Sequence, residues 1–276
     1  MPNSPWSHER RSGVADDIDF EIKGQELQFV EIELDPGESA VAEAGALVWK
    51  DASVAMTTVF GDGSADQGGG FMGKLLGAGK RLVTGESLFT TVFTHEGRGK
   101  ARVAFASPTP GAILPIRLDT VGGTLICQKD SFLCAAKGVQ IGIAFQRRVM
   151  TGLFGGEGFI MQKLDGDGWV FVQMGGTVVE RELAPGEEIH VDTGCLAAYT
   201  PSVDFDLVAV GGIRTMFSAG EGAFFARLRG PGKVWVQSLP FSRFAGRMMA
   251  AARGGGQNRG EGSALGGFGD WIGGND

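Results

Sequence analysis

The sequence predicts an all-β protein that is assembled from repeated units and followed by one short C-terminal helix. Three observations lead to this prediction. Glycine supplies 47 of the 276 residues, about 17%, which is typical of a chain with many tight turns. Apolar and polar residues alternate over short stretches, as they do in strands with one buried face. Similar stretches also recur along the chain.

The first recurring element is a β-hairpin. A Gly-Glu pair leads to a Gly-x-Gly turn at 85–99, 156–168 and 220–232. An alternating stretch follows each turn, at 101–105, 169–173 and 233–237. Glycine readily adopts the positive φ angles that tight hairpin turns require, so each copy is predicted to form a hairpin.

The second recurring element is a pair of strands behind a Pro-Gly turn. Residues 36–47 match 185–196 without a gap, and 110–127 is a looser, expanded copy. The chain therefore opens with this element at about 20–60 and closes with the hairpin element at about 220–239. We expect strands near 31–48 to pair or pack with strands near 223–237, closing a pseudo-threefold structure without an open sheet edge. The prediction is a single β domain over residues 18–240.

Four segments lie outside the repeats. Polar and charged residues 1–17 predict a flexible N-terminal segment, and residues 61–84 predict a Gly-rich loop with a short amphipathic helix. Residues 241–253 predict a C-terminal helix that ends at a glycine triplet. Residues 254–276 offer few apolar side chains to bury, so we expect a disordered Gly-rich tail.

Charge and cysteine content narrow the function classes. The 25 basic and 32 acidic residues give a net charge of −7, which argues against nucleic acid as a partner. Three cysteines, an odd number, indicate free thiols and a reducing compartment. The sequence shows neither an apolar signal-peptide core nor a run of about 18 apolar residues. We therefore expect a cytoplasmic protein.

Four motifs carry a family resemblance: GESLFTTVFT, LICQKDSFLCA, the stretch from GLFGGEGFIMQ to LAAYTPSV, and GPGKVWVQSLPFSRFAGRM. In this order, over about residues 18–250, the chain resembles the bacterial branch of the altered-inheritance-of-mitochondria family, long labelled a domain of unknown function. The resemblance implies self-association and a TRAP-like double-stranded β-helix or barrel, similar to the tryptophan RNA-binding attenuation protein. It implies no established activity. A mitochondrial location does not carry over, because we find no Arg- and Ser-rich transit segment.

Glycine-rich and acidic motifs give weak evidence of chemistry. The run 68–74 has the spacing of a phosphate-binding loop, but Leu75 stands where such a loop needs Ser or Thr for magnesium. A flexible connector is the better interpretation. Glu86, Glu157 and Glu221 occupy equivalent places, where a carboxylate ring for a cation is one reading. The preferred reading is structural, with each carboxylate accepting hydrogen bonds within its own turn.

The histidines give no stronger site. Three occur, at positions 8, 95 and 190, in a tail, a hairpin and a strand, which is a poor set for a metalloenzyme of the cupin kind. His190, Asp192 and Cys195 lie close together in sequence, where a thiol with a base suggests a nucleophile. His190 aligns with Val41 and Cys195 with Ala46, however, so structural positions are the better interpretation.

Two further pairs are interpreted as structural. Cys127 and Cys134 are predicted to face opposite sides of β structure, which argues against a metal pair. Trp169 and Trp235 lie on equivalent strands and are predicted to fill the core or a subunit contact rather than to stack on bases. We therefore predict no catalytic residue, no metal site and no cofactor.

Apolar side chains precede each Gly-Glu pair and are the candidates for an oligomer or membrane interface. They are Phe71, Leu75, Leu76, Leu153, Phe154, Met216 and Phe217. Basic residues accompany each stretch, at 80–81, 147–148 and 214. Repetition would bring them to one rim, as a patch larger than monomers usually expose. The alternative is that they fold inward as a plug. We expect a homo-oligomer, with a trimer or a multiple of it preferred.

The sequence thus predicts a non-enzymatic, self-associating β scaffold or binding protein of unestablished ligand. Two other classes stay open. One is a membrane-surface adaptor that uses the amphipathic segments 71–82 and 241–252. The other is a hydrolase or metal-dependent enzyme on a TRAP-like barrel.

Overall fold

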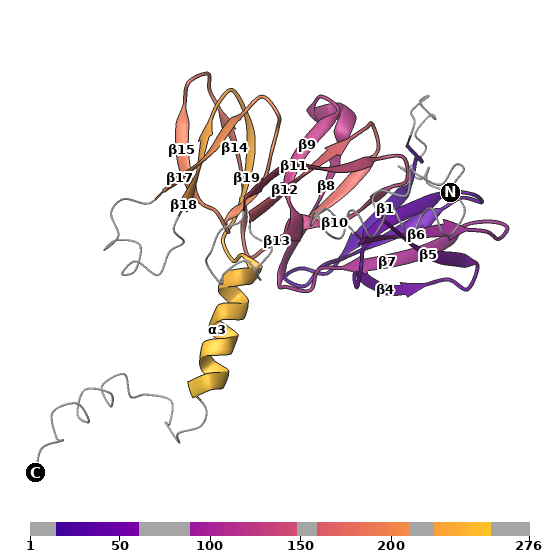
Figure 1. Cartoon of the computed structure of the whole chain (residues 1–276). Coiled ribbons are helices and arrows are strands. Elements are labelled where there is room, and N and C mark those ends of the chain that lie inside the picture. Colours follow the sequence, from indigo (N-terminus) through magenta and orange to yellow (C-terminus); the bar gives the residue numbers. More distant parts are fainter. Residues whose placement is uncertain (1–14, 61–88, 148–158, 210–223, 255–276) are drawn as a thin grey trace, which may run out of the picture.

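A computed structural model describes residues 15–60, 89–147, 159–209 and 224–254. These ranges form antiparallel β-sheets, two 3-10 turns and one C-terminal helix (Figure 1). The predicted fold class, all-β with a short C-terminal helix, is confirmed. The 3-10 turns are η1 (Leu118–Val121) and η2 (Lys129–Ser131), and the helix is α3 (Phe241–Gly254).

After an initial strand, β1 (Asp19–Lys23), the described strands form three successive units of six. The first unit contains β2 (Phe29–Leu34), β3 (Ser39–Glu43), β4 (Leu47–Lys50), β5 (Val54–Phe60), β6 (Phe89–His95) and β7 (Ala101–Ala106). The second contains β8 (Gly111–Arg117), β9 (Thr124–Gln128), β10 (Phe132–Ala136), β11 (Gln140–Arg147), β12 (Phe159–Asp165) and β13 (Trp169–Gly175). The third contains β14 (Val178–Leu183), β15 (Glu188–Asp192), β16 (Leu196–Tyr199), β17 (Asp204–Ala209), β18 (Phe224–Arg229) and β19 (Gly232–Gln237).

Strand pairing is the same in all three units. The sixth strand of a unit pairs with its first and third strands, as β7 does with β2 and β4. The fifth strand pairs with the second and fourth, as β6 does with β3 and β5. The second and third units repeat these four pairings. The repeated elements of the sequence are therefore the halves of three consecutive, complete units.

The predicted closure between the two ends of the chain is wrong. Strands β2, β3 and β4 lie in different sheets from β18 and β19. The reason is that each hairpin pairs with the strands that precede it in its own unit, so the third unit is complete without strands from the N-terminal end. The order of the motifs alone fits both arrangements.

Neighbouring units share sheets. Sheet B (β5-β6-β3-β10-β13-β8) joins half of the first unit to half of the second, and sheet C (β11-β12-β9-β16-β19-β14) joins the second to the third. The joining pairs are β3·β10 and β9·β16. Sheet A (β1-β2-β7-β4) and sheet D (β15-β18-β17) are the half sheets left at the two ends of the series.

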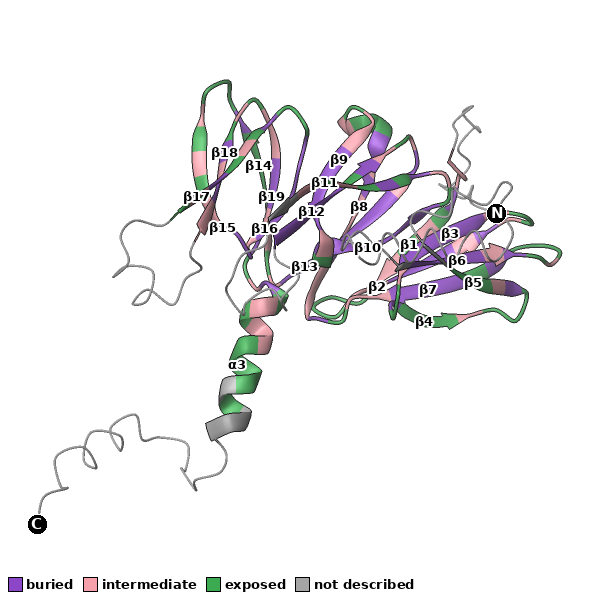
Figure 2. Ribbon diagram, in the orientation of Figure 1, coloured by how far each residue is buried: buried purple, intermediate pink, exposed green. Residues whose placement is uncertain are grey.

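The four sheets are layered in the order A, B, C, D, with an apolar core between each sheet and the next. Core 1, between sheets A and B, contains Phe105 and Phe171. Core 2, between B and C, contains Val170 and Trp235, and core 3, between C and D, contains Leu228. The inner strands of sheets B and C are thus buried on both faces, which explains the nearly continuous apolar sequences of β10, β13 and β16 (Figure 2).

Two turns show why the sequence repeats glycine. Gly37 and Gly186, in the Pro-Gly turns before β3 and β15, have φ angles of +91° and +82°. Residues other than glycine rarely adopt this left-handed backbone region, so both turns favour glycine at the same place. Both turns therefore start the second strand of their unit in the same way.

The structure describes residues 15–17 of the predicted N-terminal segment, and the tail predicted beyond Gly254 lies outside the described ranges. Asp16, in the segment predicted to be flexible, donates its N–H to Lys137 and accepts the N–H of Ser39 through its carboxylate, each at 2.8 Å. Residues 61–88, 148–158 and 210–223 lie outside the described ranges. Each joins the fourth and fifth strands of a unit, so the three segments occupy equivalent places in the repeat.

Candidate functional site

The apolar and acidic candidates from the sequence fall in the three connecting segments. These residues lie outside the described ranges: Phe71, Leu75, Leu76, Leu153, Phe154, Met216, Phe217, Glu86, Glu157 and Glu221. The predictions of a rim interface, a plug and structural turn glutamates therefore stay predictions.

His190 and Asp192, the two groups that could activate the Cys195 thiol, each have a close partner nearby in sequence. His190 lies on β15 with half of its side chain exposed, and its Nε2 is 3.2 Å from the Glu188 carboxylate. Asp192 accepts the N–H of Gly194 at 2.9 Å. Both groups that would activate the thiol are thus engaged in local contacts.

His95 is a buried structural residue. Its side chain is almost fully buried at the end of β6, where Nε2 lies 2.9 Å from the carbonyl oxygen of Gly99. Nδ1 accepts the N–H of Gly97 at 3.3 Å. The imidazole therefore fastens the turn of the β6–β7 hairpin.

Cys127 and Cys134 lie in two different cores. Cys127 belongs to core 2 and Cys134 to core 1, and neither forms a disulfide. Burial raises the pKa of both thiols well above the ordinary value, so both stay protonated and unreactive at neutral pH. Within the described part of the chain, no three His, Cys, Asp or Glu residues cluster as metal ligands.

A small polar pocket lies beside the start of α3. Gln173, Gln237 and Asp130 are among its lining residues. Gln173 donates from Nε2 to the carbonyl oxygen of Asp130 at 2.9 Å, and Gln237 donates to the carbonyl oxygen of Gly194 at 3.0 Å. The pocket has room for little more than one water molecule, which is too little for an organic substrate.

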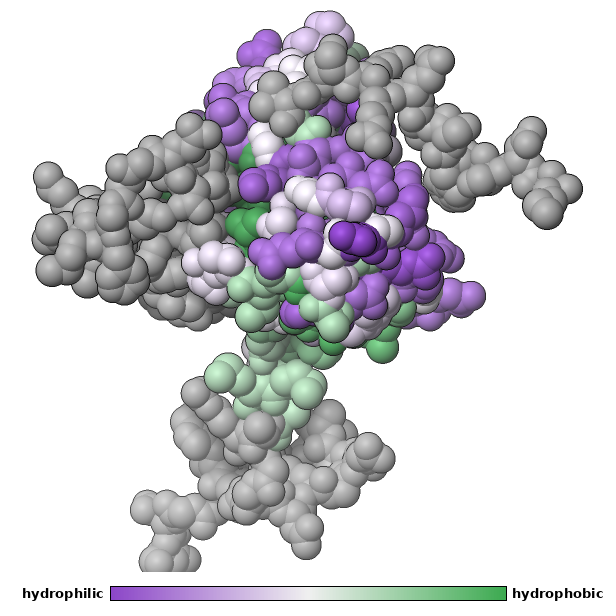
Figure 3. All heavy atoms as spheres, turned by 90° about the vertical axis from the view of Figure 1, so that its right-hand side faces the viewer, coloured by the Kyte–Doolittle hydropathy of each residue, from purple (hydrophilic) through white to green (hydrophobic). Residues whose placement is uncertain are grey.

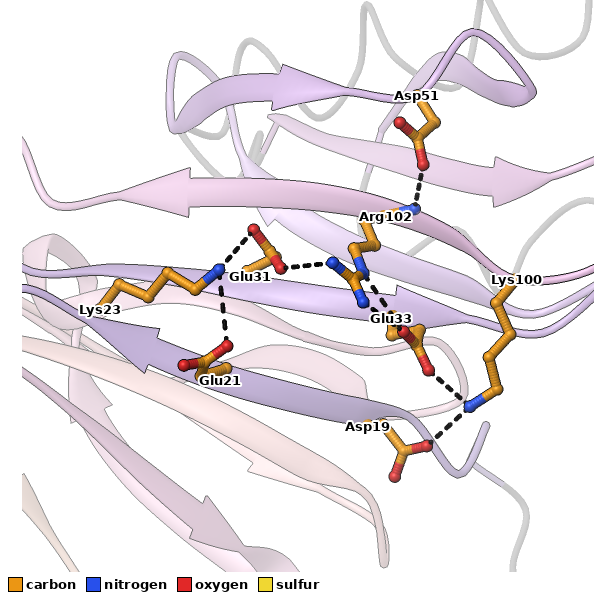
Figure 4. A network of polar contacts seen from close by, with 8 residues as sticks. All are labelled: Asp19, Glu21, Lys23, Glu31, Glu33, Asp51, Lys100 and Arg102. Carbon is orange, nitrogen blue, oxygen red and sulfur yellow. Dashed lines mark hydrogen bonds and ion pairs between the residues drawn. The ribbon is translucent and has the colours of Figure 1, made fainter. Parts of the chain in front are cut away.

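The outer face of sheet A carries a network of charged side chains (Figure 4). Lys23 pairs with Glu31 at 3.0 Å, Arg102 with Glu33 at 3.1 Å, and Lys100 with Glu33. Hydrogen bonds from Lys100 lower the pKa of Glu33, and the same kind of bond raises the pKa of Lys100. Each cation in the network is matched by acids, so the network ties β1, β2 and β7 together and offers no unpaired cation to a ligand.

The edge of sheet A differs from its surroundings. Figure 3 shows a largely hydrophilic surface on this side of the molecule. On β4, however, Leu47, Val48 and Trp49 are 37%, 52% and 36% exposed. The same positions in the other two units are at most 2% exposed: Phe132, Leu133 and Cys134 on β10, and Leu196, Ala197 and Ala198 on β16.

The difference has a simple physical cause. Strands β10 and β16 have strand neighbours on both sides, whereas β4 has β7 as its one neighbour among the described strands. At the edge of sheet D, the second strand of the third unit is likewise more exposed than the second strand of the first unit. Ile189 and Val191 of β15 are partly exposed, whereas Ala40 and Ala42 of β3 are fully buried beside β10. Sheets A and D therefore each end in a strand that is internal elsewhere.

Helix α3 projects away from the sheets (Figure 1). Phe241, Met248 and Met249 are more than half exposed. These residues share one side of the helix, and Arg243 and Arg247 lie on the other. Arg243 is 3.6 Å from the Asp192 carboxylate at the base of the helix. No helix of the described chain is long and apolar enough to cross a membrane.

Comparisons with known proteins show the family to which the chain belongs and a solved structure with a similar fold. The family model "Mitochondrial biogenesis AIM24" matches residues 20–239. An uncharacterized protein of Streptococcus pyogenes serotype M6 is 30% identical over 230 residues, covering 82% of this chain and 87% of that protein. The crystal structure of SPYM3_0169 from Streptococcus pyogenes has a TM-score of 0.67 at 24% identity, covering 85% of this chain and 99% of that one. With a match that spans all three units, the chain belongs to the mitochondrial biogenesis AIM24 family, and the resemblance inferred from its motifs is confirmed.

Proposed function

We propose that the protein is a non-enzymatic scaffold that works by associating with further copies of itself. One observation carries the proposal: among the described strands, β4 and β15 each have an edge without a strand neighbour, although the equivalent strands of the other units are internal to a sheet. An open edge presents backbone N–H and C=O groups to any strand that fits, and soluble proteins usually protect such edges with charges, proline or a cover. β4 instead exposes Leu47, Val48 and Trp49.

The described residues give the enzyme alternative little support. His95 and His190 make local contacts, Cys127 and Cys134 are buried in the cores, and the pocket beside α3 holds little more than a water molecule. We place the scaffold in the cytoplasm, where cysteines that form no disulfide remain reduced.

Light scattering on purified protein tests the proposal. The wild type is expected to have a mass that is a multiple of 29.0 kDa, with a trimer or a multiple of it preferred. Val48→Asp should shift dissociation to at least tenfold higher concentration, because a carboxylate in a strand contact has to be desolvated. Leu27→Asp, at a 68% exposed apolar residue outside the strand edges, is the matched control and should leave the mass unchanged. A wild type that stays at 29.0 kDa across micromolar concentrations contradicts the proposal.

A membrane-surface adaptor is the second candidate function, and α3 is the observation that favours it. The helix combines an exposed apolar side with arginines and contains no acidic residue, a pattern that suits the surface of an anionic bilayer. The other predicted amphipathic segment, 71–82, lies outside the described ranges.

Liposome flotation separates this candidate from a scaffold without lipid contact. Wild type should float with vesicles that contain phosphatidylserine and not with purely zwitterionic vesicles. Met249→Asp should abolish flotation, whereas Leu27→Asp, which also replaces an exposed apolar residue, should not. Equal recovery of wild type and Met249→Asp with the vesicles would reject α3 as a lipid contact.

A further inference from the structure

The half sheets at the two ends of the chain are complementary. Sheets B and C contain the fourth, fifth and second strands of one unit, followed by the third, sixth and first strands of the next. Sheet D contains only the first of these sets, in the order β17-β18-β15. Sheet A contains the second set, in the order β4-β7-β2, and adds β1. Placing β15 beside β4 would therefore complete a sheet with the strand order of B and C.

One chain cannot make this contact with itself. Sheets B and C lie between A and D, and their two faces are filled by cores 1, 2 and 3. In Figure 1, β4 and β15 lie at opposite ends of the molecule. A β15 strand beside β4 would therefore have to come from a second copy, which presents the half sheet that the first copy lacks.

The existing junctions give the register on β4. At β3·β10, Cys134 lies opposite Ala42, and at β9·β16, Ala198 lies opposite Cys127. Cys134 and Ala198 each follow a bulge against the sixth strand of their unit. Trp49 is the residue in this position on β4. Trp49 should therefore lie opposite the residue of β15 that corresponds to Ala42.

That residue of β15 is Val191. Ala42 and Val191 both stand five places after the glycine of the Pro-Gly turn that starts their strand. Since the strands run antiparallel, Trp49 opposite Val191 places Lys50 opposite His190. The register follows from the fold alone.

Side-chain chemistry agrees with the register. Val191 packs against core 3, and directly opposite residues of neighbouring strands share a face, so Trp49 would extend that core. Lys50 would lie diagonally between Glu188 and Asp192, within reach of both carboxylates. The contact thus covers the exposed apolar residues of β4 and supplies opposite charge to its lysine.

We propose that copies of the chain associate head to tail, β4 of one copy pairing with β15 of the next, in the register that sets Trp49 opposite Val191. The inference rests on the proposed scaffold function and specifies its partner surface. The contact joins two different edges, so each copy offers one of each, and a ring is the closed form that leaves neither edge unpaired.

Disulfide cross-linking between two single variants tests the proposal. In a Cys195→Ala background, which matches Ala46 of the first unit, Lys50→Cys and His190→Cys are purified separately and then mixed under mild oxidation. Directly opposite residues of neighbouring strands are close enough for a disulfide. A cross-linked dimer is expected in the mixture and in neither variant alone, and the doubly substituted chain should give a reducible ladder of multimers.

The control pairs Lys50→Cys with Asp206→Cys, on β17 at the opposite edge of sheet D, where the Asp206 side chain is 58% exposed. Cross-linking to this control as fast as to His190→Cys overturns the register. Cross-linking of Lys50→Cys to itself overturns the head-to-tail contact in favour of a β4–β4 dimer. An assembled wild type with no cross-link in the mixture overturns this inference and leaves the scaffold function standing, whereas a monomeric wild type contradicts both.

Discussion

Glu43, at the end of β3, is the carboxyl group that should dominate the pH dependence of stability near neutrality. Burial raises its pKa from 4.5 to about 7, and the negative charge of Asp130 adds to the increase while Lys129 opposes it. Between these two values the folded protein holds a proton that the unfolded chain has released. The stability contribution is therefore fully present below about pH 4.5 and is lost as the pH rises through about 7.

The magnitude follows from the same two values. A change from 4.5 to about 7 corresponds to roughly 3 kcal/mol of unfolding free energy. Glu43→Gln keeps the shape of the protonated side chain and removes the titration. The variant should therefore match the wild type near pH 4.5 and exceed it by roughly 3 kcal/mol at pH 9.

Urea unfolding at fixed protein concentration, from pH 4.5 to 9, measures this difference. Glu26→Gln, at an exposed glutamate before β2, is the control for replacing a surface carboxylate. If the curves of wild type and Glu43→Gln run parallel over the whole range, the burial of a titrating Glu43 is refuted.

Two further predictions concern the cores. Phe171→Ala should lower the free energy of unfolding by about 3–5 kcal/mol, because the fully buried ring fills core 1 and meets the Phe20 ring edge to face at 4.8 Å. A loss below about 1 kcal/mol, measured by urea unfolding, would show that sheets A and B are not packed in this way. Cysteine labelling of the folded protein, followed by peptide mass spectrometry, should modify Cys195 well before Cys127 and Cys134, whose thiols are buried and have raised pKa values. Equal rates at all three would contradict the layered arrangement.

Local features of the fold could be predicted from the sequence. The stretches 101–105, 169–173 and 233–237 form most of β7, β13 and β19, because alternation and glycine turns act within a few residues. The choice of strand partners could not be predicted in this way. A hairpin with the same motif can pair with strands before or after it, and only long-range packing selects the strands of its own unit.

In the candidate site, too, the sequence predicts the local position of a residue but not its long-range surroundings. His190 and Val41 occupy equivalent positions on β15 and β3, as their alignment predicts, yet Val41 lies in core 2 while His190 is exposed. The two environments differ because sheet B is followed by another sheet and sheet D is not. Which strands lie in an outer sheet depends on how all the sheets of the chain are ordered, and a short sequence motif does not contain this information. The edges β4 and β15 therefore could not be predicted from the sequence, although Leu47, Val48 and Trp49 form an apolar run that could have indicated the first of them.

Hydrogen exchange at β4 and β15 tests most directly whether another copy covers these edges. In the assembled wild type, the amides of β4 that face away from β7, and those of β15 that face away from β18, are expected to exchange as slowly as the amides of β10 and β9. In Val48→Asp, both sets should exchange faster while the amides of β10 and β9 stay protected. Fast exchange at both edges in the wild type, at concentrations where light scattering shows an assembly, would contradict the account.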